Sequence, residues 1–495
     1  MRTGAEYREA LRDGRRVFIL GEGRIEDVVT HPATAGMVRE YVAWYDRHFD
    51  PAWQDVVLNP PDAAGARIPV AYTVPRTSDD LVRMGRCFSA TTYPTAGNIT
   101  HTPLYGHMIA MGVAHAVNLR DASPQQLANA EAYRAHVAAT GRFVTFAAGA
   151  ATIGYRLRPD PAERNALRVV RETDAGLVVN GKIGMHTSPA YAEDVYIGAN
   201  NGVDYQGHRA TFAVAVNAPG VTVILRKRSA HDPNPFTSPL SSRFDELDGQ
   251  MWLDDVLIPW ERVFLTEPSA EPVARWLFWH QCHCWLAKAE FTLGLGLACA
   301  QAMGLMQHEL TQDYLLDLTT DVQTVRACLV ATERDPVFTE PEGWCAPNHA
   351  HLAAASLAML RARPRMGEIL RALPGSSLVV APSDTDLADP ELAAGLAACF
   401  EGGGFTALQR AALLQLAWDH CGSALDHRES VYELHANGGV QGWRNRLRRN
   451  FNDYDALANV AMAQAGTAMP SVSFARFRDA PMAARRPVTP PPPKS

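Results

Sequence analysis

The chain has few cysteines, no strong excess of either charge and no long apolar run. Its 8 cysteines among 495 residues are too sparse for a framework of disulfide bonds. A net charge of -7 at pH 7 gives no reason to expect nucleic acid or an anionic membrane as a partner. The longest apolar run, at 292–306, is interrupted by small and polar residues and is too short to cross a bilayer.

An export signal and a metal-binding pattern are missing as well. Charged residues of both signs occur within the first fifteen positions, and no apolar signal-peptide core is visible. With so few cysteines, this predicts a cytoplasmic protein whose thiols are reduced. The motif HQCHC at 280–284 carries four side chains of metal-ligand type, but on one helix they would point to several faces. We therefore predict no metal site.

A phosphate-binding GxGxxG motif after a strand is the third absence. Gly294 and Gly296 lie inside an apolar helical run that lacks a third glycine, and the glycines at 402–404 resemble a loop before a helix. The chain therefore shows no evident dinucleotide-binding domain of its own.

What the chain does contain is a change of pattern along its length. Residues 1–140 are expected to be mainly helical, and residues 141–270 contain short β-branched runs that predict a compact β-domain. The dipeptide Asn180-Gly181 predicts a hairpin turn within it. Residues 271–480 repeat apolar side chains at helical spacing and predict a bundle, and 481–495 form a proline-rich tail. The four long helices are expected at 291–306, 320–334, 351–370 and 408–424.

The most informative stretch is 241–264, SSRFDELDGQMWLDDVLIPWERVF, in which polar turns flank β-like segments. Its charged residues Arg243, Asp245, Glu246 and Asp248 are expected to form ion pairs that order a loop rather than to do chemistry. The stretch resembles the signature of the flavin-dependent 4-hydroxyphenylacetate 3-hydroxylase oxygenases. Further similar segments follow in the family's order at 2–15, 30–32, 212–220, 288–294 and 427–433.

The resemblance implies an α+β fold like that of the acyl-CoA dehydrogenases. An N-terminal helical domain, a central β-barrel or sandwich and a C-terminal four-helix bundle are expected in that order. It also implies a homotetramer, built as a dimer of dimers, with the flavin held between the β-domain and the bundle.

The resemblance further implies the FADH2-dependent oxygenase component of a two-component flavin monooxygenase of the group D type. FADH2 would come from a separate NAD(P)H:flavin reductase, in keeping with the missing dinucleotide domain. With O2 as co-substrate, a C4a-hydroperoxyflavin would hydroxylate a small electron-rich aromatic or heteroaromatic molecule. A flavin oxidase or dehydrogenase on the same scaffold and a non-catalytic member stay open. A dehydratase relative would need an iron–sulfur cluster, for which Thr91, four residues after Cys87, is no ligand.

The same resemblance assigns cofactor-binding and catalytic residues. Thr187 would lie near the reactive edge of the isoalloxazine, although a hydroxyl that caps a turn is the alternative. His280 would titrate near neutrality and help to form the hydroperoxide, with a core or interface histidine as the alternative. The cofactor-binding residues expected in all are Thr145, Phe146, Ala148, Thr187 and Ser188.

The sequence departs from the family where the substrate would bind. The family's Arg-x-x-x-Tyr pair reads His101 and Tyr105 here, and the family's histidine after a threonine reads Phe146 after Thr145. The substrate pocket is expected to contain His101, Tyr105 and Phe146, with His101, Tyr105 and His280 catalytic. Loss of the guanidinium removes bidentate anchoring of an anion.

This departure suggests a hypothesis about the substrate. The acceptor would be electron-rich already, such as an indole, a pyrrole, an amine or a polyketide-type phenol of specialised metabolism. In one alternative His101 is the replacement base and Tyr105 orients the substrate, and in another His101 is a surface loop histidine.

Overall fold

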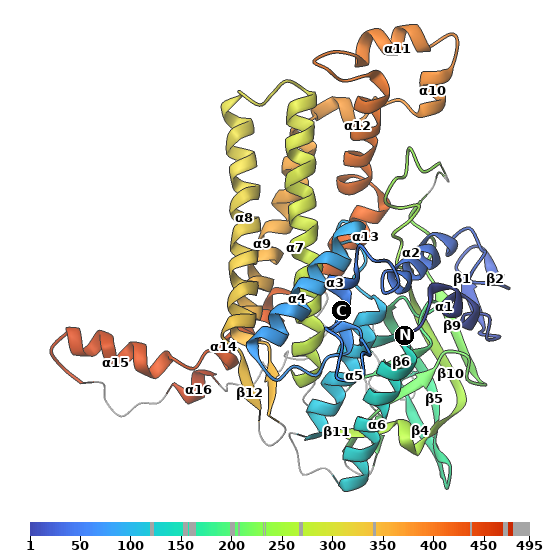
Figure 1. Cartoon of the computed structure of the whole chain (residues 1–495), viewed down its shortest axis with the longest axis vertical. Coiled ribbons are helices and arrows are strands. Elements are labelled where there is room, and N and C mark those ends of the chain that lie inside the picture. Colours follow the sequence, from blue (N-terminus) through green and yellow to red (C-terminus); the bar gives the residue numbers. More distant parts are fainter. Residues whose placement is uncertain are drawn as a thin grey trace, which may run out of the picture.

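The computed structural model describes residues 1–118, 123–151, 157, 165–198, 203–205, 208–230, 232, 234–266, 271–339, 343–435, 438–468 and 474–478. The predicted proline-rich tail at 481–495 lies outside these residues. Among them, no helix is long and apolar enough to cross a membrane. The fold combines a mixed sheet with long helices, and it is of the predicted α+β type (Figure 1).

The central element is a sheet to which the described residues contribute eleven strands. Its main path runs in the order β11-β8-β6-β3-β5-β10-β9-β1-β2, with β4 paired to β5 and β7 paired to β8. The N-terminal strands β1 and β2 were not predicted, and β1 joins the sheet by pairing parallel to β9. The strands are β1 (Val17–Ile19), β2 (Gly23–Ile25), β3 (Val144–Ala150), β4 (Arg168–Thr173), β5 (Gly176–Thr187), β6 (Asp194–Ile197), β7 (Val203–Tyr205), β8 (His208–Ala215), β9 (Val221–Leu225), β10 (Asp248–Pro259) and β11 (Val263–Thr266).

The predicted turn at Asn180-Gly181 is wrong, because both residues lie inside β5. Asn180 pairs with Arg168, and Gly181 pairs with Leu253. Gly181 has a φ of +135°, and a Cβ there would stand 2.5 Å from the carbonyl oxygen of Ala166. The glycine thus permits a close backbone approach within the sheet, which is the other common reason for glycine in a strand.

Helices cover one side of the sheet. Helix α5 (Pro103–Asn118) contacts β3, and α6 (Pro124–Thr140) contacts β11. Capping boxes start α4 (Ser78–Thr92) and α6, which fixes where these helices begin. The other helices of this part are α1 (Gly4–Ala10), α2 (Ala35–Asp46) and α3 (Gln54–Val57).

The C-terminal part contains the predicted long helices. Helices α7 (Glu271–Ala302), α8 (Glu309–Arg334) and α9 (His349–Ala372) stand side by side in Figure 1, and α12 (Ala407–Cys421) packs on α7 and α9. Helix α6 ends and α7 begins close to the predicted boundaries, while the division into domains stays a prediction. The remaining elements are α10 (Asp384–Ala388), α11 (Ala393–Phe400), α13 (Ala424–His435), α14 (Gly439–Asn450), α15 (Tyr454–Gln464), α16 (Ala475–Arg478), β12 (Val337–Thr339) and β13 (Trp344–Ala346).

Candidate functional site

The three predicted catalytic side chains come together from α7 and from the start of α5 with the residues just before it. His101 lies just before α5, Tyr105 lies in the first turn of α5, and His280 lies in α7. The ring centroids of His101 and Tyr105 are 4.3 Å apart, and those of Tyr105 and His280 are 6.1 Å apart. His101 is only 4% exposed, so the alternative of a surface loop histidine is wrong.

The segment that carries His101 is fixed by hydrogen bonds from distant parts of the chain. The backbone N–H groups of Thr100 and His101 donate to Oε1 of Glu246 over 2.9 and 2.7 Å. The hydroxyl of Tyr41 donates to the carbonyl oxygen of His101 over 2.8 Å. On the side chain, Nδ1 of His101 lies 2.9 Å from Oγ1 of Thr100. The imidazole therefore has a defined position before any ligand binds.

Burial keeps the side chains of this cluster neutral around pH 7. It lowers the pKa of His101 to about 3, and the positive charge of Arg428 acts in the same direction. Burial also lowers the pKa of His280 to about 3, so the prediction that this imidazole titrates near neutrality is wrong. The pKa of the Tyr105 hydroxyl is raised by the same cause. A neutral imidazole thus stands where the family pattern has a permanent cation.

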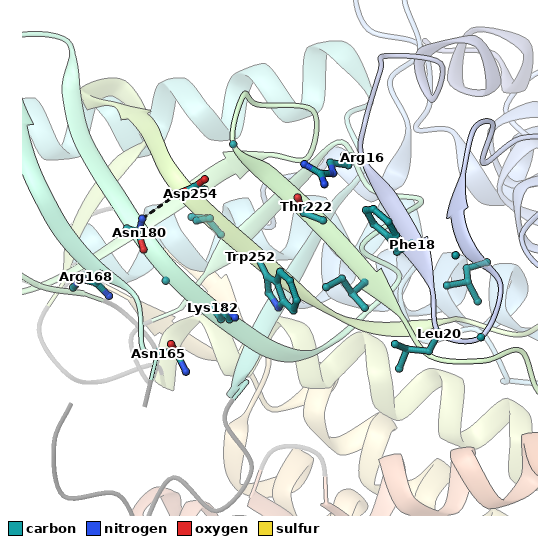
Figure 2. A pocket seen from close by; sticks show the side chains of 17 residues that line it. Arg16, Phe18, Leu20, Asn165, Arg168, Asn180, Lys182, Thr222, Trp252 and Asp254 are labelled. Atoms are coloured by element: carbon teal, nitrogen blue, oxygen red, sulfur yellow. Dashed lines mark hydrogen bonds between the residues drawn. The ribbon is translucent and has the colours of Figure 1, made fainter. Parts of the chain in front are cut away.

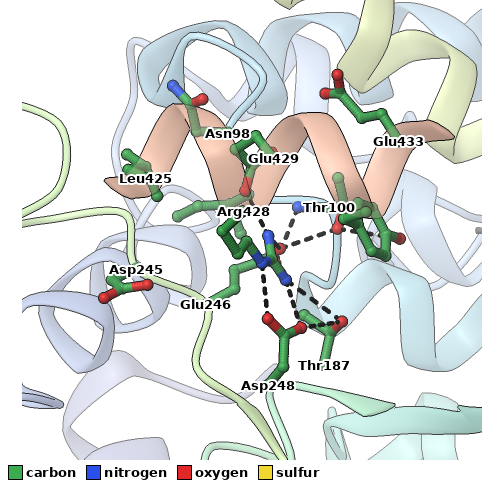
Figure 3. A network of polar contacts seen from close by, with 12 residues as sticks. Asn98, Thr100, Thr187, Asp245, Glu246, Asp248, Leu425, Arg428, Glu429 and Glu433 are labelled. Atoms are coloured by element: carbon green, nitrogen blue, oxygen red, sulfur yellow. Dashed lines mark hydrogen bonds and ion pairs between the residues drawn. The ribbon is translucent and has the colours of Figure 1, made fainter. Parts of the chain in front are cut away.

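Thr187 ends β5 and belongs to a polar network that ties the sheet to α13 (Figure 3). Its hydroxyl donates to Oδ1 of Asp248 over 2.8 Å, and Arg428 of α13 binds both carboxylate oxygens of Asp248 over 2.6 and 2.7 Å. Although burial opposes it, Arg428 holds the pKa of Asp248 well below its usual range. Arg428 also pairs with Glu429 and lies 3.6 Å from Glu246. The ends of the interior strands β5 and β10 are therefore joined to α13 at this point.

Arg243 and Asp245, two further residues of the charged group in this stretch, form ion pairs, as predicted. Asp245 pairs with Arg226, which also lies 3.0 Å from Asp248. Arg243 lies 3.0 Å from Glu40 of α2. These contacts order the loop between β9 and β10 and hold it against the N-terminal helices.

A buried ionic cluster continues from the network into the bundle. Lys288 of α7 contacts Glu429 and Glu433, and Arg363 of α9 contacts Glu433 and Asp426. Every partner is compensated by an opposite charge, which buried ions require. The segments at 288–294 and 427–433 that carry the family resemblance therefore meet in space.

Two predicted cofactor-binding hydroxyls are engaged within the protein. Oγ1 of Thr145 donates to the carbonyl oxygen of Thr187 over 2.7 Å. Ser188 has a φ of +61°, and its hydroxyl lies 2.9 Å from that of Tyr41. Both residues shape the turn after β5, so the structure gives them a positioning role at the end of this strand.

Phe146, the third predicted residue on β3, presents a half-buried ring. The ring stacks on Tyr196 with centroids 6.0 Å apart. A Cβ at position 198 would lie 2.4 Å from the ring of Phe146, so Gly198 is needed beside that ring. Ala148 lies in a part of β3 whose side chains are outside the described residues.

His186, one residue before Thr187, was not predicted from the sequence. It pairs across the sheet with Ala147 and Gly249, is 2% exposed, and neither ring nitrogen hydrogen-bonds to another described residue. Burial lowers its pKa to about 4 against the opposing charge of Asp248. A buried polar group without a partner costs about 1–3 kcal/mol, which indicates a missing ligand or water. The sequence around it, MHTSP at 185–189, gives no sign that this histidine is buried without a partner.

The side chains of Cys282 and His283 in the HQCHC motif contact different partners. Sγ of Cys282 lies 3.3 Å from the hydroxyl of Ser356, whereas Nε2 of His283 lies 2.9 Å from Glu333. In the part of the chain that the structure describes, no group of three or more His, Cys, Asp or Glu side chains could hold a metal ion.

A pocket of about 740 Å³ lies elsewhere, on the face formed by β5, β10, β9 and β1 (Figure 2). Its lining includes Trp252, with the ammonium of Lys182 4.2 Å from the ring centroid, and also Phe18 and Arg16. None of the predicted site residues lines it. This pocket therefore lies apart from the cluster of His101, Tyr105 and His280.

Comparison with protein families gives two matches that together span most of the chain. Residues 3–265 match the family described as "4-hydroxyphenylacetate 3-hydroxylase N terminal". Residues 272–465 match the family described as "4-hydroxyphenylacetate 3-hydroxylase C terminal".

Individual relatives agree with these matches. The 4-hydroxyphenylacetate 3-monooxygenase oxygenase component of Thermus thermophilus is 29% identical, over 87% of this chain and 91% of its own. A Streptomyces globisporus monooxygenase acting on a carrier-protein-bound (3S)-3-amino-3-(3-chloro-4-hydroxyphenyl)propanoyl group is 29% identical, covering 90% of this chain and 86% of its own. A crystal structure of an oxygenase component of 4-hydroxyphenylacetate 3-monooxygenase with FAD and 4-hydroxyphenylacetate superposes with a TM-score of 0.85 at 26% identity, over 94% of this chain and 99% of the other.

Proposed function

Because the chain belongs to the 4-hydroxyphenylacetate 3-hydroxylase family, we propose that it uses reduced FAD and O2 to hydroxylate an electron-rich aromatic or heteroaromatic substrate. The chain is the oxygenase component of a two-component flavin monooxygenase. A separate NAD(P)H-dependent reductase would supply the reduced flavin. An assembly of four subunits is part of the proposal, and the mass of the purified protein in solution tests it.

The observation that carries the proposal is the convergence of His101, Tyr105 and His280 in one buried cluster. The segment holding His101 is anchored to Glu246, which lies two residues before Asp248 in the network at Thr187. Residues from the N-terminal helices, the sheet and the bundle therefore meet at one place.

Features of the strand end fit a bound flavin. The ring nitrogens of His186, one residue before Thr187, have no hydrogen-bond partner among the described residues and could bond to such a ligand. Phe146 points to the opposite face of the sheet, because its neighbour Ala147 is the residue that pairs with His186. When bound, reduced FAD would supply two electrons and activate O2 at its C4a position as a hydroperoxide. Tyr105 would orient the substrate, and the buried site would exclude water from it.

The neutral imidazole of His101 favours a substrate other than 4-hydroxyphenylacetate. A buried, uncharged ring cannot neutralise an anionic group as a guanidinium does. An acceptor such as an indole, a pyrrole, an amine or a polyketide-type phenol needs no such anchor. A flavin oxidase or dehydrogenase on this scaffold would leave the same residues in place without transferring oxygen.

Stopped-flow spectroscopy tests the proposal. When the protein with reduced FAD is mixed with oxygenated buffer, we expect a transient C4a-hydroperoxide absorbance before the oxidised flavin appears. His280→Gln should shorten the lifetime of this species or prevent its formation. Direct reoxidation of wild type without a transient would instead favour an oxidase, and absent flavin binding would favour a non-catalytic protein.

A further inference from the structure

We propose that Glu246 is the terminal proton acceptor of the site and receives the proton of an ionisable substrate hydroxyl through His101 and Thr100. The proposal rests on the proposed function and deepens it, since it names the substrate class as a phenol or a comparable hydroxyl compound. Glu246 was expected only to order a loop, and Thr100 was not predicted at all.

The geometry requires Thr100 as a bridge. Its Oγ1 lies 2.9 Å from Nδ1 of His101 and 2.9 Å from Oε2 of Glu246. The direct approach of Nδ1 to Oε1 of Glu246 is 4.0 Å, which is too long for a hydrogen bond. The hydroxyl of Tyr432 stands 3.5 Å from Oγ1, so it competes only weakly.

The direction of these hydrogen bonds depends on the charge of Glu246. When the carboxylate is ionised, it can only accept, so the Thr100 hydroxyl donates to it and accepts from Nδ1–H of His101. Nε2 of His101 is then the unprotonated nitrogen, and it makes no hydrogen bond to another described residue. This nitrogen can accept a proton from a substrate.

The transfer is balanced and leaves no charge on the imidazole. The substrate O–H bond breaks as Nε2–H forms, the Nδ1–H proton moves to Thr100, and the Thr100 proton moves to Oε2 of Glu246. One proton passes from the substrate to Glu246, His101 changes tautomer, and the substrate oxygen becomes negative and therefore electron-rich.

Burial decides where the proton rests. It lowers the pKa of His101 to about 3, so the imidazole alone is a poor acceptor at neutral pH. Burial raises the pKa of Glu246 to about 7, with Arg428 opposing and Glu429 supporting the shift. A carboxyl that titrates near neutrality can both take and release a proton during turnover.

The surroundings of Glu246 contain few groups that could replace it. Arg428 is a permanent cation, and Glu429 is engaged by Lys288 and Arg428. The tyrosines and the cysteine nearby have raised pKa values and stay protonated, so none can accept the proton. These neighbours, from α2, the turn after β5, α5, α7 and α13, are Tyr41, Tyr191, Tyr105, Cys284 and Tyr432.

Infrared difference spectroscopy of the full-length protein over a pH series tests the acceptor without a substrate. We expect a carboxylic acid band with a midpoint near pH 7 that is missing in Glu246→Gln. Thr100→Val removes a donor to the ionised carboxylate and should raise the midpoint, whereas Thr100→Ser should restore it. Thr332→Val is the matched control, because among the described residues its buried hydroxyl bonds to nothing but the carbonyl oxygen of Cys328. A band that survives Glu246→Gln, or equal midpoints in Thr100→Val and Thr332→Val, overturns the proposal.

A second experiment uses 4-nitrophenol, whose anion absorbs visible light, as the probe. At a pH where free 4-nitrophenol is still mostly protonated, the bound probe should carry more phenolate than the free probe in wild type, because Glu246 takes its proton. This excess of phenolate should be lost in Thr100→Val, which has no hydroxyl to pass the proton on. No excess phenolate in wild type, or the same excess in both proteins, contradicts the proposal.

Failure of this inference can be told apart from failure of the proposed function. If oxygenation occurs and Thr100→Val keeps the wild-type pH profile of kcat/KM, the relay is wrong and the function stands. If no phenol is oxygenated while the band and the bound phenolate behave as expected, the relay stands and the oxygenase proposal fails.

Discussion

At the scale of single residues, we infer that His101 decides which substrates the site can hold. His101→Arg would restore a guanidinium beside Tyr105 and should raise kcat/KM for 4-hydroxyphenylacetate by roughly tenfold, the effect of about 1.4 kcal/mol from one charge-assisted hydrogen bond. Steady-state turnover with reduced FAD measures it. Efficient use of 4-hydroxyphenylacetate by wild type would contradict this view of His101.

The buried imidazole of His107 makes the stability of the fold depend on pH. It is fully buried, neither ring nitrogen has a hydrogen-bond partner among the described residues, and burial lowers its pKa from 6.5 to about 3. The unfolded chain therefore takes up a proton below pH 6.5 that the folded protein refuses, so stability falls as pH drops.

His107→Phe should remove that loss. Relative to wild type, the substitution should raise the unfolding free energy by about 2 kcal/mol more at pH 5 than at pH 7.5. The figure follows from the interval of about 1.5 pH units between pH 5 and the ordinary histidine pKa of 6.5, at about 1.4 kcal/mol per unit. Urea unfolding at both pH values measures the difference, in which the change of packing cancels. The same change at both pH values would show that the histidine is not buried in its neutral form.

At the scale of elements, the contact of α13 with the strand ends positions the site. Arg428 contacts Asp248 and Glu429 and lies near Glu246, so its loss leaves buried carboxylates without compensation. Arg428→Leu should lower the unfolding free energy by about 3–5 kcal/mol, the usual cost of breaking a buried pair. Arg365→Leu, on an exposed pair with Asp321, should cost about 1 kcal/mol or less. Similar losses in both variants would show that α13 is not held by this network.

Element prediction succeeded where a pattern is local and failed where contacts are distant. The apolar spacing of 320–334 and 351–370 identified α8 and α9, because one face of a helix must be buried whatever its partner is. Asn180-Gly181 has the local signature of a turn, yet Ala166 and the neighbouring strands hold it extended. The pairing of β1 with β9 across some two hundred residues has no local signature.

The residues of the candidate site also divide into those that the sequence reveals and those that only the folded chain reveals. His101, Tyr105, Thr187 and His280 were identified because they occupy positions of a family pattern. The bridge from Thr100 to Glu246 spans 146 residues of sequence, so only the folded chain reveals it. His186 also stayed hidden, since its meaning depends on burial without a hydrogen-bond partner.

At the scale of the whole molecule, three regions of the chain build one buried site. The N-terminal helices contribute His101 and Tyr105, the sheet contributes Thr187 and Asp248, and the bundle contributes His280. In the described residues the network around Arg428 connects the last two regions. The chain therefore supplies all the side chains of the proposed site, and in the proposed function the electrons come with reduced flavin from a separate reductase.

Turnover under isotopically labelled dioxygen tests whether the protein transfers oxygen to its substrate. The protein would be supplied with FAD, NADH, a separate flavin reductase and a panel of phenols, indoles and pyrroles, and the products analysed by mass spectrometry. We predict one labelled oxygen atom in the product, dependent on the reductase and strongly reduced in His280→Gln. Unlabelled oxidised products, with all of the label recovered as hydrogen peroxide or water, would contradict the account.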